Sequence, residues 1–322
     1  MKPEFGRREF VTGMAAVGAL SLAGGILRAD LVSPFQIAVI TDEITQDFGR
    51  ACEVIGKDFG MRYVELRELW GKNLFDLDAK QLQEAKNILD KYGLGVADIA
   101  SPLFKVDWPG APKSKFSPTG DKFNASFTFD QQGDVLSRAI KLAKLFKCPR
   151  VRCFDFWRLD DPKPYRKEIN KKLLDAANEL GKNGLILVLE NEPSCNTATG
   201  KESGAVLTDI QSPYFFLNWD PGNAAYHGES PFPEGYSHIP SGRIGHCHAK
   251  DVRRSNGAQG YEWAAMGSGE IDWVGQFRAL KTDGYRHGVS LETHWRGAGS
   301  PEDSTRESWK GMRSELAKAG IL

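Results

Sequence analysis

Short apolar runs and longer amphipathic stretches follow one another along most of this chain. The short runs are rich in residues that favour β-strands, and they end at turn residues or at charged residues. Eight segments fit strands: 35–44, 63–69, 95–103, 151–156, 185–190, 215–220, 245–248 and 288–292. Regular alternation of such strands with helical stretches predicts parallel strands joined by helical crossovers.

The stretches between the strands have the apolar spacing of helices. Six of them are clear: 47–59, 79–92, 130–146, 165–183, 272–284 and 302–319. The stretch 197–212 is expected to hold a short helix, whereas 230–242 carries three prolines and is expected to be mostly loop. Two long loops, 104–127 and 253–270, follow the third and seventh strands. The pattern predicts an α/β protein with a single (β/α)8 TIM barrel, in which both loops rise over the barrel mouth.

Each of the last four strands ends in a side chain that can bind a metal. These side chains are Glu190, Asp220, the histidine pair His246 and His248, and Glu292. Their spacing fits one strand and one helix per step, so we expect them at the same end of neighbouring strands, where barrel active sites lie. Alternation along a strand sends His246 and His248 to the same face, so strand geometry does not choose between them.

Composition excludes some functions. The chain has 322 residues, of which 41% are hydrophobic and 26% charged, which is typical of a globular protein. Lys plus Arg and Asp plus Glu both number 42, so no basic excess favours binding to nucleic acid or to an anionic membrane. The five cysteines are scattered and give neither a disulfide framework nor a zinc pattern.

The first residues have the character of a targeting segment. Arg7 and Arg8 precede the weakly apolar stretch 10–27, which resembles a twin-arginine export signal. We therefore expect a signal peptide over 1–29, a barrel domain over 30–322, and a periplasmic or other extracytoplasmic location. The alternative is a retained membrane anchor, but the glycines and alanines make this stretch weakly hydrophobic, so no stable membrane insertion is expected after signal removal.

Five motifs in the second half carry a family resemblance. Together they resemble the xylose-isomerase-like TIM-barrel superfamily, in its sugar isomerase/epimerase branch; the motifs are LENEP at 189–193, WDPGN at 219–223, HCHAKD at 246–251, GSGEIDW at 267–273 and GYRHGVSLE at 284–292. The resemblance implies one divalent ion held by Glu190, Asp220, His248 and Glu292. It thus selects His248, and His246 is then expected to be buried behind the ligands.

The resemblance also bears on substrate binding. Arg254, six residues after His248, matches a substrate-binding arginine of the epimerases, and Asn223 stands where the nearest of them usually carry histidine. The full set of candidate substrate-binding residues is Arg254, Lys250, Glu65, Glu192, Asn223 and His294. Structural alternatives are a solvated charge at Arg254, a rim histidine at His294, and a salt bridge between Glu65 and Arg67.

The ligand types favour one kind of chemistry. Three carboxylates and one imidazole suit Mn²⁺ best, with Mg²⁺, Co²⁺ or Zn²⁺ as alternatives, and they leave one or two positions for substrate oxygens. An ion that chelates a sugar carbonyl and its neighbouring hydroxyl acidifies the carbon between them, through a metal-held enediolate. Glu190 and Glu292 are then the expected acid/base pair. Two bases on opposite sides of the carbon give epimerisation, and one base shared by neighbouring carbons gives isomerisation.

Three other functions compete with this one. A lyase or dehydratase acting on a keto-sugar, keto-inositol or 3-keto-glycoside begins with the same proton abstraction and stays open. An apurinic-site endonuclease of the superfamily needs histidines from the early strands, and no histidine precedes His227. A non-catalytic carbohydrate-binding barrel would not need the full ligand set. The expected partner is a small sugar or sugar derivative and no nucleic acid; the oligomeric state stays open, with a homo-oligomer as one option.

Overall fold

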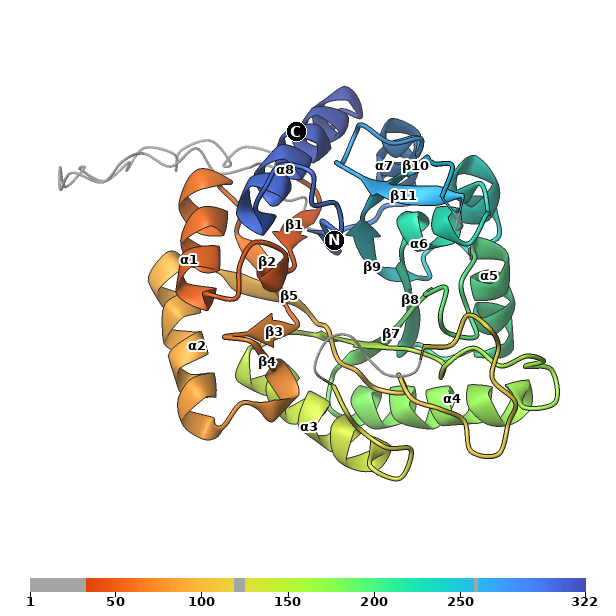
Figure 1. Ribbon diagram of the computed structural model, residues 1–322. Helices are drawn as coiled ribbons and strands as arrows, with labels where there is room; N and C mark the ends of the chain where they lie inside the picture. Colours follow the sequence, from red (N-terminus) through yellow and green to blue (C-terminus); the bar gives the residue numbers. More distant parts are fainter. Residues whose placement is uncertain (1–32, 119–124, 258–259) are drawn as a thin grey trace, which may run out of the picture.

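Eight strands build the main sheet of the computed structural model, which describes residues 33–118, 125–257 and 260–322. They are β1 (Gln36–Val39), β2 (Tyr63–Leu66), β5 (Gly95–Ile99), β6 (Arg150–Cys153), β7 (Ile186–Glu190), β8 (Phe215–Trp219), β9 (Ile244–Ala249) and β12 (Gly288–Leu291). Their order is β1-β12-β9-β8-β7-β6-β5-β2, and neighbours pair in parallel. A parallel bridge between Ile40 and Glu65 joins the two edges and closes the barrel (Figure 1).

Helices surround this sheet on its outer side (Figure 1). They are α1 (Phe48–Glu53), α2 (Ala79–Tyr92), α3 (Gln132–Leu145), α4 (Arg166–Lys182), α5 (Gly200–Asp209), α6 (Pro221–Tyr226), α7 (Trp273–Thr282) and α8 (Pro301–Lys318). Local sequence sets their ends. In α2, the Asp78 side chain accepts a hydrogen bond from the backbone N–H of Gln81, and Gly93 ends the helix with φ of 64°. The expected single (β/α)8 barrel is confirmed.

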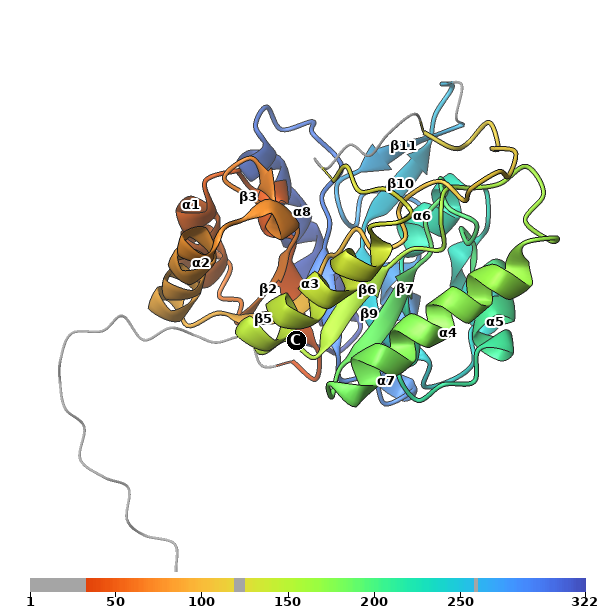
Figure 2. The same ribbon diagram turned by 90° about the horizontal axis from the view of Figure 1, so that it is seen from below.

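Two small antiparallel hairpins extend the barrel. They are β3 (Glu68–Leu69) with β4 (Lys72–Asn73), and β10 (Asp251–Arg254) with β11 (Tyr261–Ala264). Both follow the carboxyl ends of barrel strands, and Figure 2 shows them at the same end of the barrel. The segment 253–270, expected as loop, therefore contains most of a hairpin, because Asp251 and the residues after it continue in extended conformation beyond β9.

The helices on either side of β8 differ in part from the expected ones. The short helix expected within 197–212 is present as α5, but α6 begins directly after Asp220, where no helix was expected. Asp220 caps α6 by accepting from the backbone N–H of Asn223, and Pro221 takes the first helical position. Within 230–242, the backbone at Phe232 is extended, with φ of −142° and ψ of 133°, so Pro231–Gly235 form an irregular turn and not a regular helix. The pair Asp220-Pro221 is typical of a helix start, so it could have predicted α6 from the sequence.

The core lies between the sheet and the helices. Alternation along β8 sends Trp219 outward, where its indole N–H donates to Gln276 of α7 at 3.0 Å, and sends Asn218 inward. The interior of the barrel is correspondingly polar, with fully buried side chains that include Glu65, Asn218 and His248. Among the described residues, no helix combines the length and apolar character needed to cross a membrane. The expected export segment, 1–29, lies outside the described residues.

Candidate metal centre

Four side chains from four neighbouring strands meet at the carboxyl end of the barrel. Glu190 is the last residue of β7, Asp220 follows β8, His248 lies near the end of β9, and Glu292 follows β12. All four are buried, and one ligand atom of each lies within 4.8 Å of the ligand atoms of the other three. The structure thus brings together the residues that the sequence placed at equivalent strand ends.

The imidazole of His248 shows how this cluster is arranged. Its Nδ1 lies 3.4 Å from Glu190 Oε1, 3.3 Å from Glu292 Oε2 and 3.7 Å from Asp220 Oδ2. This nitrogen is buried and makes no hydrogen bond of its own within the described residues. Burial opposes a charge on His248, yet Glu65, Glu190 and Glu292 raise its pKa well above the usual range, so positive charge is stabilised at this point. The donor set therefore fits a divalent cation, since three carboxylate oxygens and one imidazole nitrogen converge on one point.

Three cationic side chains balance the carboxylates. Arg152 lies 3.0 Å from Glu190 Oε2, Arg67 lies 2.8 Å from Glu292 Oε1, and the Lys250 ammonium lies 2.6 Å from Glu292 Oε2. Burial opposes the charge of Glu190, but Arg152 and His248 hold its pKa at about 2. Burial likewise opposes the charge of Glu292, yet Lys250 and the nearby imidazoles hold its pKa well below the usual range. Both glutamates are therefore ionised at neutral pH.

Three of the expected substrate-binding residues lie at the cluster. Lys250 also contacts Asp220 Oδ2, at 2.8 Å. Asn223 donates its side-chain N–H to Glu190 Oε1 at 3.2 Å, and His294 Nε2 lies 3.3 Å from Glu292 Oε1. His294 is partly exposed, so it forms part of the rim, whereas Lys250 and Asn223 are buried beside the carboxylates.

The other three lie elsewhere. The side chain of Arg254 is 78% exposed and pairs with Glu270, so it points to solvent on β10. Glu192 is partly buried and accepts from the hydroxyl of its neighbour Ser194 at 2.9 Å. Glu65 is fully buried and lies behind His248, where its Oε1 is 3.1 Å from His248 Nε2. The salt bridge between Glu65 and Arg67, which was the structural alternative, is not formed, and Glu65 pairs with His246 and His248 instead.

Sequence reasoning missed the two arginines that hold the glutamates. Arg67 is 3% exposed and donates to Glu292, Asp42 and Glu43, so it joins the loop after β1 to the loop after β12. Arg152 lies on β6, two residues after Arg150 on the same face. The alternating arginines Arg150 and Arg152 in a buried strand could have predicted a nearby carboxylate, because a buried arginine needs a carboxylate partner.

The hairpin β10–β11 covers this end of the barrel from one side. Its Trp263 ring lies 5.1 Å from the Lys250 ammonium and stacks on Tyr226 of α6, with ring centroids 4.7 Å apart and 12° between the planes. The edge of His294 also meets this indole, at 5.1 Å between centroids. Trp263 was not singled out from the sequence, because the segment around it was expected to be loop.

Three solved structures share this fold with the chain. D-allulose 3-epimerase from Methylomonas sp. is 16% identical, with a TM-score of 0.64 over 90% of this chain and 99% of that one. The probable 3-DHS dehydratase AsbF from Bacillus anthracis is 16% identical, with a TM-score of 0.64 over 85% and 97%. A xylose isomerase-like TIM barrel protein from Mycobacterium smegmatis in complex with magnesium is 16% identical, with a TM-score of 0.62 over 89% and 98%.

Comparison with curated proteins finds no match. At such low identity, the three solved structures show the fold alone. The family model for the xylose isomerase-like TIM barrel matches residues 55–315, which include seven of the eight barrel strands and all four clustered ligands. On that match, the chain belongs to the xylose isomerase-like TIM barrel family.

Proposed function

We propose that this protein is a divalent-metal-dependent enzyme that moves a proton at a carbon beside the carbonyl of a sugar, as an isomerase or epimerase. The observation that carries the proposal is the buried His248 Nδ1, which faces Glu190, Asp220 and Glu292 and has no hydrogen-bond partner of its own among the described residues. The family match and the epimerase among the structural neighbours support it.

The four clustered residues would hold the ion. Mn²⁺ is the preferred candidate because oxygen donors dominate the set, and Mg²⁺, Co²⁺ and Zn²⁺ are alternatives. Magnesium is the metal in one of the structural neighbours. When bound, such an ion stabilises negative charge that develops on the substrate oxygens next to the reacting carbon.

Glu190 and Glu292 are the proposed acid/base pair. Each is fixed on both carboxylate oxygens: Glu190 by Arg152 and Asn223, and Glu292 by Arg67 and Lys250. Their low pKa values make them weak bases, so proton removal requires a substrate carbon that is itself acidified. Fixed carboxylates approach the carbon from set directions, which favours stereochemically defined transfer.

An elimination reaction is the second candidate, and the position of Lys250 favours it. Its ammonium lies 2.6 Å from Glu292 and 2.8 Å from Asp220, so it is placed beside the proposed base to hydrogen-bond a leaving oxygen of the substrate. A probable dehydratase is also among the structural neighbours. Elimination shares its first step with epimerisation, so the two reactions differ only after the proton has been removed.

Hydrogen exchange in deuterated water tests the shared first step. A panel of keto-sugars and 3-keto-glycosides is incubated with Mn²⁺-loaded protein, and NMR detects deuterium at the carbon beside the carbonyl as well as epimerised or eliminated products. Glu190→Gln should lower exchange by roughly 10² to 10⁴, as is typical of a lost general acid or base. Glu262→Gln, an exposed glutamate on β11, is the matched control and should exchange at the wild-type rate.

Two outcomes would contradict the proposal. If Glu190→Gln binds Mn²⁺ and sugar normally and still exchanges at the wild-type rate, Glu190 is only a ligand and the acid/base assignment fails. If wild-type protein exchanges equally well after chelation of the metal, the metal-dependent reaction itself is excluded.

A further inference from the structure

Beneath the metal ligands, Glu65 of β2 bridges two histidines of β9. Its Oε2 lies 2.9 Å from His246 Nε2, and its Oε1 lies 3.1 Å from His248 Nε2. All three side chains are 0% exposed. Glu65 is 181 positions from His246 and 183 positions from His248, so the fold of the barrel, and not closeness in sequence, brings them together.

The surroundings hold this arrangement in place. The hydroxyl of Ser290, on the neighbouring strand β12, lies 3.0 Å from His246 Nε2. Gly288 makes room for the ring: a Cβ added there would lie 2.5 Å from His246 Cε1, far inside contact distance. Any side chain at position 288 would therefore displace His246 and, with it, one partner of Glu65.

The contacts to Glu65 determine which nitrogen of His248 carries the proton. A carboxylate accepts hydrogen bonds and does not donate them, so Nε2 must carry the hydrogen that points to Glu65. As a metal ligand the imidazole is neutral and has only one N–H, so Nδ1 is left with a lone pair directed at Glu190 and Glu292. The buried Asn218 Oδ1, which makes no hydrogen bond as placed, can accept from the same Nε2–H after the amide turns over.

We propose that Glu65 is a positioning residue for the metal centre, which fixes His248 in the orientation and tautomer that present Nδ1 as a ligand. It acts through His248 and not through contact with the sugar. The inference rests on the proposed metal site and adds a residue to it. Carboxylates that accept from ligand histidines raise ligand basicity and restrict ring rotation, and their loss typically lowers metal affinity by roughly 10-fold to 100-fold.

Binding of Mn²⁺ alone, without sugar, tests the role of Glu65. Glu65→Gln keeps the volume but offers only one acceptor oxygen to the two imidazole N–H groups, so Mn²⁺ affinity should fall by roughly 10-fold to 100-fold. Asp98→Asn is the matched control, because Asp98 is the β5 neighbour of Glu65 in the sheet register and is equally buried. Its carboxylate oxygens make no hydrogen bond within the described residues, so its Mn²⁺ affinity should match that of wild type.

A second measurement uses wild-type protein and does not depend on a folded variant. In protein loaded with diamagnetic Zn²⁺ or Mg²⁺ in place of Mn²⁺, histidine labelled with ¹⁵N should show, for His248, a protonated Nε2 and a coordinated Nδ1. A protonated Nδ1 with Nε2 as the ligand would overturn the proposal. Equal Mn²⁺ affinity in Glu65→Gln and wild type would overturn it as well, as would equal losses in Glu65→Gln and Asp98→Asn.

Failure of this inference is distinguishable from failure of the proposed function. Wild-type protein that binds no Mn²⁺ or related divalent ion contradicts the metal centre itself. Wild-type protein that binds Mn²⁺, together with a Glu65→Gln variant that binds it equally well, contradicts only the positioning role of Glu65.

Discussion

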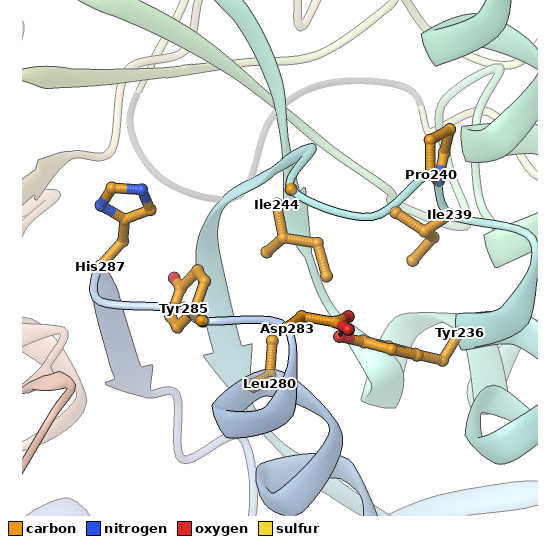
Figure 3. A pocket seen from close by; sticks show the side chains of 10 residues that line it. Tyr236, Ile239, Pro240, Ile244, Leu280, Asp283, Tyr285 and His287 are labelled. Carbon is orange, nitrogen blue, oxygen red and sulfur yellow. Dashed lines mark hydrogen bonds between the residues drawn. The ribbon is translucent and has the colours of Figure 1, made fainter.

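The two ends of the barrel are built from the same strands but differ in how their polar groups are satisfied. At the amino end, the two tyrosines beside a hollow of about 80 Å³ have partners: the Tyr236 hydroxyl donates to Asp283, and the Tyr285 hydroxyl donates to the Gly288 carbonyl (Figure 3). At the carboxyl end, His248 Nδ1 faces three carboxylates and has no hydrogen-bond partner of its own among the described residues. Satisfied groups serve the fold, whereas groups that converge without partners indicate a binding site.

The difference arises from where each residue lies on its strand. Along β9, Ile244 lines the amino-end hollow, while His248 lies four residues further on and reaches the cluster. One strand therefore contributes to packing at its start and to the candidate metal centre at its end. If the two roles are independent, substitutions at one end should leave the other end unchanged.

Metal binding should give the largest difference between the ends. With Mn²⁺ at a thousandfold excess over its Kd, the free energy of unfolding should rise by about 4 kcal/mol, because only the folded protein has the site. His248→Ala should abolish this gain, whereas His287→Gln, at the amino end, should retain it. Urea unfolding with and without Mn²⁺ measures the effect. Equal stabilisation of the His248→Ala protein would place the ion elsewhere.

Truncation at the amino end should show the opposite behaviour. Ile244 is 7% exposed and packs beside the hollow, so Ile244→Ala should lower the free energy of unfolding by about 3 kcal/mol through lost burial and a larger cavity. Mn²⁺ affinity of the folded variant should stay at the wild-type value. Calorimetry and metal titration report the two effects independently, and a weakened Mn²⁺ affinity would show that the two ends are coupled.

The sequence predicted the strands and the clustered residues for the same physical reason. Apolar runs mark barrel strands, and the carboxyl ends of parallel strands converge, so Glu190 and Glu292 could be brought together without knowing any contact. The choice of His248 over His246 required the family resemblance. The helix α6 was not expected, because the Asp220-Pro221 pair was interpreted only as a strand end with a metal ligand.

The partners of the ligands could not be predicted from local pattern. Arg67 donates to Glu292 across 225 positions, and sequence spacing carries no information on such a pair. Glu65 and Arg67 lie on the same face of one extended segment, but Arg67 is two residues nearer the mouth and takes the contacts with Glu292 and Glu43. Glu65 lies deeper in the barrel and contacts His246 and His248. The different depths of Glu65 and Arg67 within the barrel therefore explain why they have different partners.

Substitution of Trp263, in the hairpin β10–β11, should weaken sugar binding and leave metal binding unchanged. Trp263 lies over Lys250 and against His294, so Trp263→Leu should lower affinity for a bound sugar by roughly tenfold, or about 1.4 kcal/mol, through lost aromatic contact. Mn²⁺ affinity should not change. Phe116→Leu is the control, because Phe116 is 48% exposed and contacts His227 instead. NMR titration with the sugars that exchange deuterium measures the affinity. An unchanged affinity in Trp263→Leu would remove the hairpin from the binding surface.

The smallest expected effect is a pH dependence that originates at the amino end. Burial, together with the Arg150 guanidinium 2.8 Å from Nδ1, lowers the pKa of His287 to about 4. The unfolded chain has the ordinary histidine pKa near 6.5 and takes up a proton first as pH falls, so stability is lost between about pH 6.5 and pH 4. Because His287 is partly exposed, solvent screening should limit this contribution to about 1 kcal/mol. His287→Gln cannot titrate, so its unfolding free energy should fall less than that of wild type over this range. Urea unfolding at pH 7, 5.5 and 4 measures the difference, and parallel curves for the two proteins would show that His287 keeps an ordinary pKa.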